Sequence, residues 1–143
     1  MTEKTELAIR EFCQYNDIDS EEVIGLINDG DIDIVAGDYR FIDKNHIDRI
    51  MCEEMESDPY ILGCYNAWFI AENTDLSIDI IEALQEADKF EAIGRHIIDN
   101  DFVEAMQQSS VSYDGYGLHF AGYDGYEIED LLNVCGYYVF RVN

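Results

Sequence analysis

Basic residues are scarce in this sequence, and their scarcity excludes several classes of protein. The chain has 143 residues, with only 8 Lys or Arg against 32 Asp or Glu and 3 His, so its formal net charge is −24 at pH 7. Binding to nucleic acid or to an anionic membrane through a basic patch is excluded, because the electric field of the chain has the wrong sign. The same field favours cationic partners.

Long apolar runs, repeated proline and paired cysteines are also lacking. The longest uncharged run, residues 60–71, has 12 residues and is too short to span a bilayer. The first ten residues contain no apolar segment, so we expect no signal peptide and a location in the cytoplasm of a host cell. No C-x-x-C pair occurs, so zinc spacing is absent, and we expect reduced and mostly buried thiols at Cys13, Cys52, Cys64 and Cys135.

Apolar residues are plentiful enough to build a core, at 48% of the chain with 13% aromatic. Apolar spacing, breakers and N-caps at Asp19, Asp43 and Asp58 predict helices at 3–15, 19–28, 43–55, 59–72, 75–87, 89–98 and 102–107, and a short helix or turn at 128–133. Strands are predicted at 31–35, 38–42, 117–121 and 136–142. The expected fold class is α+β, mainly α. It has a helix-turn-helix with a β-hairpin wing (residues 1–56), then a central helical bundle and a small C-terminal antiparallel sheet (residues 57–143), packed as one compact unit.

Residues 6–51 carry a resemblance to a known DNA-binding family. The order is helix, short turn, the helix "DSEEVIGLINDG", the hairpin "DIDIVAGDYRFI" and the capped helix "DKNHIDRIM". This stretch resembles an excisionase-type winged helix-turn-helix domain, with Gly30 between helix and wing and Gly37 at the wing tip. The resemblance implies that the second helix would read the major groove of DNA and that the wing would touch its backbone.

The charges of this stretch are the reverse of those that such a domain needs. Between Glu11 and Tyr39 there are nine acids and no Lys or Arg. DNA binding depends on basic side chains that release counterions from phosphate, so this surface is not expected to bind DNA. We expect it to bind a basic protein instead, through acids at Glu21, Glu22, Asp29, Asp31 and Asp33.

A second row of acids has helical spacing. Asp75, Asp79, Glu82 and Glu86 follow one another at steps of four, three and four residues, which places them on one face of the predicted helix at 75–87. From Met51 to Asp88 there are ten acids and no Lys or Arg. Like charges at these spacings destabilise a helix, so their retention favours a role in recognition.

Two interpretations of this acidity remain open. In the first, rigid carboxylates imitate the phosphates of DNA and occupy the basic groove of a nucleic-acid-binding protein. In the second, the acids form a solvated face that serves solubility or salt tolerance. By composition alone the chain resembles small acidic proteins of phages and mobile elements that block restriction, CRISPR or repair enzymes by occupying their DNA sites.

The sequence therefore predicts a non-enzymatic, DNA-mimicking inhibitor of a basic host defence or DNA-processing protein, of antirestriction or anti-CRISPR type. An immunity protein or antitoxin against one basic nuclease or toxin is the first alternative. A structural protein-interaction module is the second. The partner would be a basic nucleic-acid-binding protein, with no direct contact to nucleic acid or membrane, and the oligomeric state is open.

Catalytic and cofactor motifs are missing from the sequence. The acids from Asp29 onward do not follow a calcium loop, because Gly30 comes too early and Arg40 stands where the bidentate glutamate is required. The histidines have no H-E-x-x-H context, and no phosphate-binding glycine loop or nucleophile elbow occurs. We expect no enzyme activity, no metal and no cofactor. A C-terminal group of tyrosines is expected mostly to pack, with one or two as contacts: Tyr113, Tyr116, Tyr123, Tyr126, Tyr137 and Tyr138.

Overall fold

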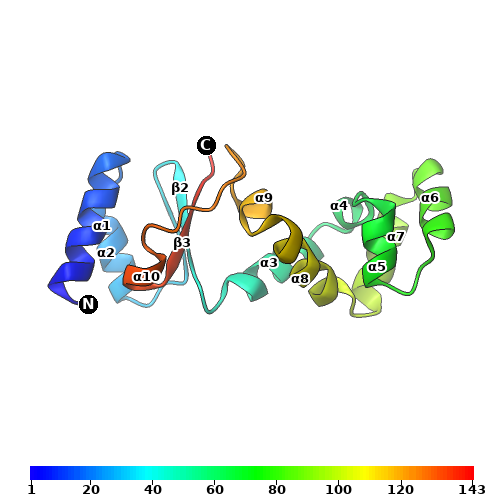
Figure 1. Cartoon of the computed structure of the whole chain (residues 1–143), viewed down its shortest axis with the longest axis horizontal. Helices are drawn as coiled ribbons and strands as arrows, with labels where there is room; N and C mark the ends of the chain where they lie inside the picture. Colours follow the sequence, from blue (N-terminus) through cyan, green and yellow to red (C-terminus); the bar gives the residue numbers. More distant parts are fainter. The chain divides into compact units, whose positions relative to one another are not determined.

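The computed structural model describes residues 1–143, which form ten helices and one three-stranded antiparallel sheet (Figure 1). The fold class is α+β and mainly α, as the sequence predicts. The elements are α1 (Glu3–Tyr15), α2 (Ser20–Asn28), β1 (Asp33–Ala36), β2 (Tyr39–Asp43), α3 (Ile47–Glu56), α4 (Pro59–Gly63), α5 (Ala67–Asn73), α6 (Ile78–Glu86), α7 (Phe90–Asp99), α8 (Val103–Asp114), α9 (Gly117–Phe120), α10 (Leu132–Cys135) and β3 (Tyr137–Arg141).

The chain divides into two compact units, and the division differs from the predicted one. Unit 1 contains Met1–Ile47 and Asp114–Asn143, and unit 2 contains Asp48–Tyr113. The predicted boundary at residue 56 is wrong because the C-terminal strand does not form a sheet of its own. β3 pairs instead with β2 of the N-terminal hairpin, in the order β1-β2-β3, with Phe41 opposite Val139. The last thirty residues therefore complete the N-terminal unit.

Unit 1 packs helices against this sheet, and α1, α2 and α10 lie beside the strands in Figure 1. Phe12 on α1 makes edge-to-face contacts with Tyr39 and Phe41 of β2, with ring centroids 6.1 Å apart in both pairs. Ile9, Val23, Ile34 and Val139 are among the buried side chains of the same core. The predicted hairpin is confirmed, and its two-residue turn is Gly37–Asp38, where Gly37 has a φ of +58°.

Unit 2 contains only helices, and its tightest contact joins α4 to α7. A Cβ placed on Gly63 would lie 1.8 Å from the carbonyl oxygen of Phe90, and one placed on Gly94 would lie 1.7 Å from that of Pro59. Only glycine allows the two backbones to come this close. Gln85 of α6 adds hydrogen bonds to the carbonyl oxygens of Gly63 (3.0 Å) and Tyr65 (2.9 Å). Close backbone contact therefore helps to hold the short helix α4 in place, together with the buried side chain of Leu62.

Several predicted elements are corrected by the structure. The helix expected at 59–72 is interrupted, because Asn66 accepts a hydrogen bond from the backbone N–H of Trp68 (3.1 Å) and begins a new helix, α5. The strand expected at 117–121 is the short helix α9, closed by a bond from Ala121 N–H to the Gly117 carbonyl oxygen (2.9 Å). A run of five residues is too short for alternation to distinguish a strand from one helical turn.

No helix of the structure is long and apolar enough to cross a bilayer.

Candidate functional site

The acidic side chains lie almost entirely on the surface of both units. Of the 32 acids, all but four are exposed: the partly buried ones are Glu6, Asp43, Glu54 and Glu127. Unit 1 holds 17 acids and 5 Lys or Arg, and unit 2 holds 15 acids and 3 Lys or Arg, so each unit has a formal net charge of −12. The negative charge therefore belongs to two folded surfaces.

The first candidate surface, called the α2 surface, carries fewer unpaired charges than the sequence suggests. It consists of the five predicted acids on and beside α2: Glu21, Glu22, Asp29, Asp31 and Asp33. Glu21 forms an ion pair with Arg10, and Asp33 receives two hydrogen bonds from Arg40, at 2.8 and 2.7 Å. Arg10 lies eleven residues before Glu21, so this pair depends on the packing of α1 against α2. Arg40 lies seven residues after Asp33, and the two meet across the hairpin. Strand pairing places Arg40 on β2 close to Asp33 on β1, because Val35 stands opposite Arg40 and Asp33 lies two residues before Val35.

Three acids of this surface have no ion pair: Glu22, Asp29 and Asp31. Glu22 lies in the first turn of α2, whereas Asp29 caps its C-terminal end and Asp31 follows. The nine residues of α2 separate the two ends by roughly 13 Å. The five acids predicted for this surface therefore do not form one continuous row.

The second candidate surface is on α6, and the structure removes one acid from the predicted row. α6 begins at Ile78, where Ser77 is the N-cap and accepts a hydrogen bond from the N–H of Ile80 (3.3 Å). Asp75 lies before the helix, so it does not share a helical face with Asp79, Glu82 and Glu86. The capping serine at position 77 was the sequence signal for the later start.

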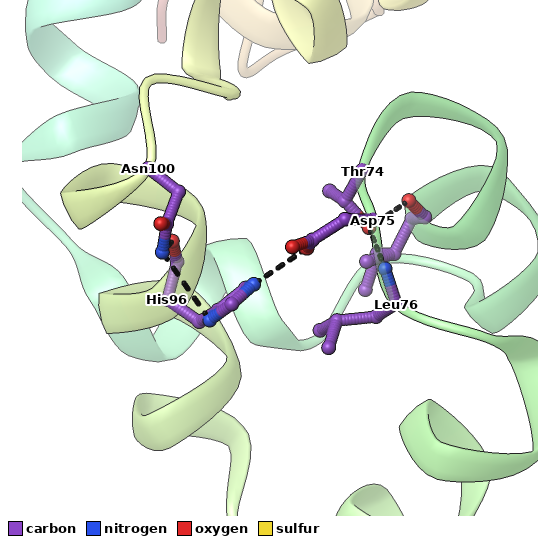
Figure 2. A network of polar contacts seen from close by, with 6 residues as sticks. Thr74, Asp75, Leu76, His96 and Asn100 are labelled. Atoms are coloured by element: carbon purple, nitrogen blue, oxygen red, sulfur yellow. Dashed lines mark hydrogen bonds and ion pairs between the residues drawn. The ribbon is translucent and has the colours of Figure 1, made fainter.

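Asp75 has a structural contact of its own (Figure 2). Its Oδ1 atom lies 2.7 Å from Nε2 of His96 on α7, and this hydrogen bond lowers the pKa of the Asp75 carboxyl. Nδ1 of the same imidazole lies 3.3 Å from the Asn100 side chain, and its ring stacks on Phe102. The loop is further shaped by Thr74, whose hydroxyl donates to the Ile70 carbonyl oxygen (2.8 Å). Asp75 therefore connects the α5–α6 loop to α7.

The remaining acids of α6 face solvent without any cation of the chain. Asp79, Glu82 and Glu86 are exposed and form no ion pair, and Ile81 is the only buried residue of the helix. Their rise along the axis is about 4.5 Å and then about 6 Å. One strand of duplex DNA carries a charge every ~3.4 Å of axis, so the row on α6 has about two thirds of that linear density. These three carboxylates form an unpaired acidic row on one helix.

Other acids stabilise local structure. The Asp19 carboxylate accepts hydrogen bonds from the N–H groups of Glu21 (3.0 Å) and Glu22 (3.4 Å) and caps α2, as predicted. Asp58 caps α4 through the N–H of Ile61 (3.2 Å), with Pro59 in the first position. Asp43, expected to cap the third helix, accepts from Asn45 instead, and α3 begins only at Ile47. Asp19 and Asp58 therefore have a structural role as helix caps.

Cys13 and Cys52 are poorly suited to nucleophilic chemistry. Burial, with a smaller contribution from neighbouring acids, raises the pKa of Cys13 and of Cys52 to about 11, so both are protonated thiols at neutral pH. Of the four cysteines only Cys13 is fully buried, whereas Cys52 and Cys135 are partly buried and Cys64 is exposed. The prediction of mostly buried thiols therefore holds only in part. No three His, Cys, Asp or Glu side chains gather where they could hold a metal ion.

Two surface features of unit 2 were not predicted from the sequence. A hollow of about 430 Å³ in unit 2 is lined mainly by polar residues, among them Asp48, Glu104 and the buried Gln107, which donates to Asp48 (2.8 Å). A pair of exposed aromatic side chains, Trp68 on α5 and Tyr113 on α8, also lies on unit 2. Among the C-terminal tyrosines, Tyr137 is buried, Tyr116 and Tyr138 are partly buried, and the other three are exposed.

Comparison with known proteins gives no match: no protein-family model, no curated protein and no solved structure is similar to this chain.

Proposed function

We propose that this protein is a non-enzymatic inhibitor that binds the basic nucleic-acid-binding groove of a host defence or DNA-processing protein by imitating DNA. The observation that supports the proposal is the placement of charge. Each of two compact units carries a net charge of −12 on an ordered surface. A phage or a mobile element would encode such a protein, and it would act in the host cytoplasm.

The α6 surface, defined by Asp79, Glu82 and Glu86, is the strongest candidate for the imitation of phosphates. Its three carboxylates are fixed on one helix, and no Lys or Arg of the chain neutralises them. A basic groove that has evolved to bind DNA would attract this row by the same long-range field, and such steering raises association rates by 10–10³-fold. The repulsion within the row is then the cost of recognition.

The α2 surface contributes fewer free anions. Glu22, Asp29 and Asp31 are available to a partner, whereas Glu21 and Asp33 are already paired with Arg10 and Arg40. We propose that these two paired acids add little to partner binding, because their charges are largely compensated within the protein.

Competition with DNA tests the proposal most clearly. The chain is immobilised, proteins are captured from a host lysate at low salt, and bound proteins are eluted with duplex DNA. We expect nucleic-acid-binding proteins in the DNA eluate. Capture of a single toxin that DNA does not displace would contradict mimicry and indicate an immunity protein. Binding that ignores both DNA and salt would indicate a structural module.

A matched pair of double variants separates the α6 surface from general acidity. Glu82→Gln with Glu86→Gln removes two unpaired charges of α6. Glu53→Gln with Glu91→Gln removes two charges of the same unit that are paired with Arg49 and Arg95. Both pairs change the net charge equally, so the proposal expects clearly weaker capture only for the first. Equal capture by the two double variants would exclude α6 as the contact.

A further inference from the structure

Unit 2 displays two large aromatic side chains in contact with each other. The ring centroids of Trp68 and Tyr113 are 5.8 Å apart at an interplanar angle of 89°. Trp68 is 47% exposed and Tyr113 is 60% exposed. Both rings rest edge-to-face on the buried Phe69, at 6.0 and 6.3 Å. The pair is therefore held in a defined geometry while much of its area remains in water.

A carboxylate lies at the edge of this aromatic pair. Glu72 follows Trp68 by one helical turn on α5, and the hydroxyl of Tyr113 lies 3.5 Å from its Oε2 atom. Glu72 is exposed and forms no ion pair, so its oxygens can still accept hydrogen bonds from a partner. Aromatic faces and a free carboxylate in one place are the groups that recognise a guanidinium.

In unit 1, two arginine side chains lie over aromatic rings. The guanidinium of Arg141 lies 3.9 Å from the ring centroid of Tyr123, and that of Arg40 lies 5.1 Å from the centroid of Phe120. In unit 2 both arginines form ion pairs along their own helices instead, and no cation of the chain lies over Trp68 or Tyr113. The aromatic pair of unit 2 is therefore open to an arginine from outside.

We infer that Trp68, Tyr113 and Glu72 form a binding site for an arginine side chain of the basic partner. The inference rests on the proposed function and names the chemistry of one contact. Charge complementarity selects this occupant: unit 2 has a net charge of −12, and an apolar partner would have to remove water from Glu72 without compensating its charge. Arginine is favoured over lysine because its planar group stacks on a ring and can bind a carboxylate through two hydrogen bonds.

The chain contains a single tryptophan, so tryptophan emission, excited at a wavelength that tyrosine absorbs little, reports on this site alone. The full chain is titrated with nona-arginine and, separately, with nona-lysine, which has the same charge. We expect both peptides to bind with salt-dependent affinity, and only nona-arginine to change the Trp68 emission strongly. Nona-arginine should also bind about 3- to 10-fold more tightly than nona-lysine.

Variants then test the two supporting residues while the reporter is kept. Tyr113→Leu and Glu72→Gln should each weaken nona-arginine binding about 2- to 5-fold and leave nona-lysine binding nearly unchanged. Tyr15→Leu is the matched control, because Tyr15 is 90% exposed and makes no ring contact, and Glu11→Gln is the control for the lost charge. Circular dichroism confirms that each variant is folded.

The outcomes separate this inference from the proposed function. Equal affinity for the two peptides, together with unchanged binding by Tyr113→Leu, would overturn the arginine site while leaving the electrostatic proposal intact. Failure of both peptides to bind at low salt would contradict the proposed function as well. Stronger quenching of Trp68 by a single-stranded oligonucleotide than by nona-arginine would show that the rings stack on bases, and would also overturn the arginine site.

Discussion

The Nε2 atom of His96 lies 2.7 Å from the Oδ1 atom of Asp75, so Asp75 has a hydrogen-bond partner within unit 2. This contact holds Asp75 in the loop before α6 and joins that loop to α7 (Figure 2). The acidic row on α6 therefore consists of Asp79, Glu82 and Glu86. Asp75 stabilises the structure of unit 2, whereas Asp79, Glu82 and Glu86 are exposed and have no ion-pair partner in the chain.

Replacing His96 should restore an ordinary pKa to Asp75. In the folded protein the hydrogen bond from His96 lowers the pKa of Asp75. The contact therefore stabilises the fold at pH values above the ordinary pKa of an aspartate. The contribution is lost as the pH falls through the lowered pKa. We expect His96→Gln to raise the pKa of Asp75, measured by NMR titration of its carboxyl carbon. An unchanged value in the variant would mean that the two side chains do not interact in solution.

Gly94→Ala should destabilise unit 2 by about 1–3 kcal/mol or more, because the new methyl group would collide with the backbone of Pro59. Gly25→Ala in α2 is the matched control. A Cβ at Gly25 meets nothing within 4 Å, so alanine should stabilise α2 by about 0.5–1 kcal/mol. Urea unfolding of both variants measures the difference. Equal stabilities for the two would contradict the close packing of α4 on α7.

Asp19→Ala should cost about 1 kcal/mol of stability, although it removes one negative charge from a very acidic chain. The variant leaves two N–H groups at the start of α2 without their partner. Asp19→Asn removes the same charge and keeps an oxygen that can cap the helix. Thermal unfolding should therefore show a loss for alanine and a much smaller change for asparagine. The reverse order would indicate that charge, and not capping, dominates at this position.

Glu82→Gln with Glu86→Gln should leave the protein as stable as before or more stable by a few tenths of a kcal/mol. The two carboxylates repel each other across one helical turn, and Glu86 lies at the C-terminal end of α6, where the helix dipole disfavours an anion. Asp79 is retained in this variant because it lies in the first turn, where an anion is favourable. The gain should shrink as salt is added.

The double variant Glu53→Gln with Glu91→Gln gives the opposite expectation. It breaks two pairs at a spacing of four residues and should lower stability by a few tenths of a kcal/mol per pair. Parallel thermal unfolding at low salt compares the two. A loss of stability in the α6 variant would assign those acids to structure and would weaken the case for recognition.

Local signals in the sequence predicted much of the fold. Asp19 and Asp58 marked the starts of α2 and α4, and Gly30, with a φ of +86°, follows the C-terminal end of α2 as expected. These features depend on a few neighbouring residues, so the sequence displays them directly. The fold class and the N-terminal hairpin follow from the same kind of pattern.

Long-range pairing was beyond the reach of the sequence. β3 carries the alternation of a strand, but nothing in residues 137–141 names β2 as its neighbour, and so the predicted boundary between units was wrong. Likewise, the pairing of Glu21 with Arg10 requires the tertiary fold, as does the contact of Trp68 with Tyr113, whereas Asp33 and Arg40 meet across the predicted hairpin. Counting acids in the sequence therefore overestimated the number of unpaired charges on the α2 surface.

If the exposed carboxylates attract a basic nucleic-acid-binding groove, the association rate constant of the complex must depend on the salt concentration. Binding of this chain to a protein that it captures, and that duplex DNA displaces, is followed by stopped-flow fluorescence of Trp68. Between about 50 and 200 mM salt we predict that the rate constant falls by at least about tenfold, because screening removes the steering field. A rate constant that is independent of salt over this range would contradict electrostatic attraction between the carboxylates and a basic groove.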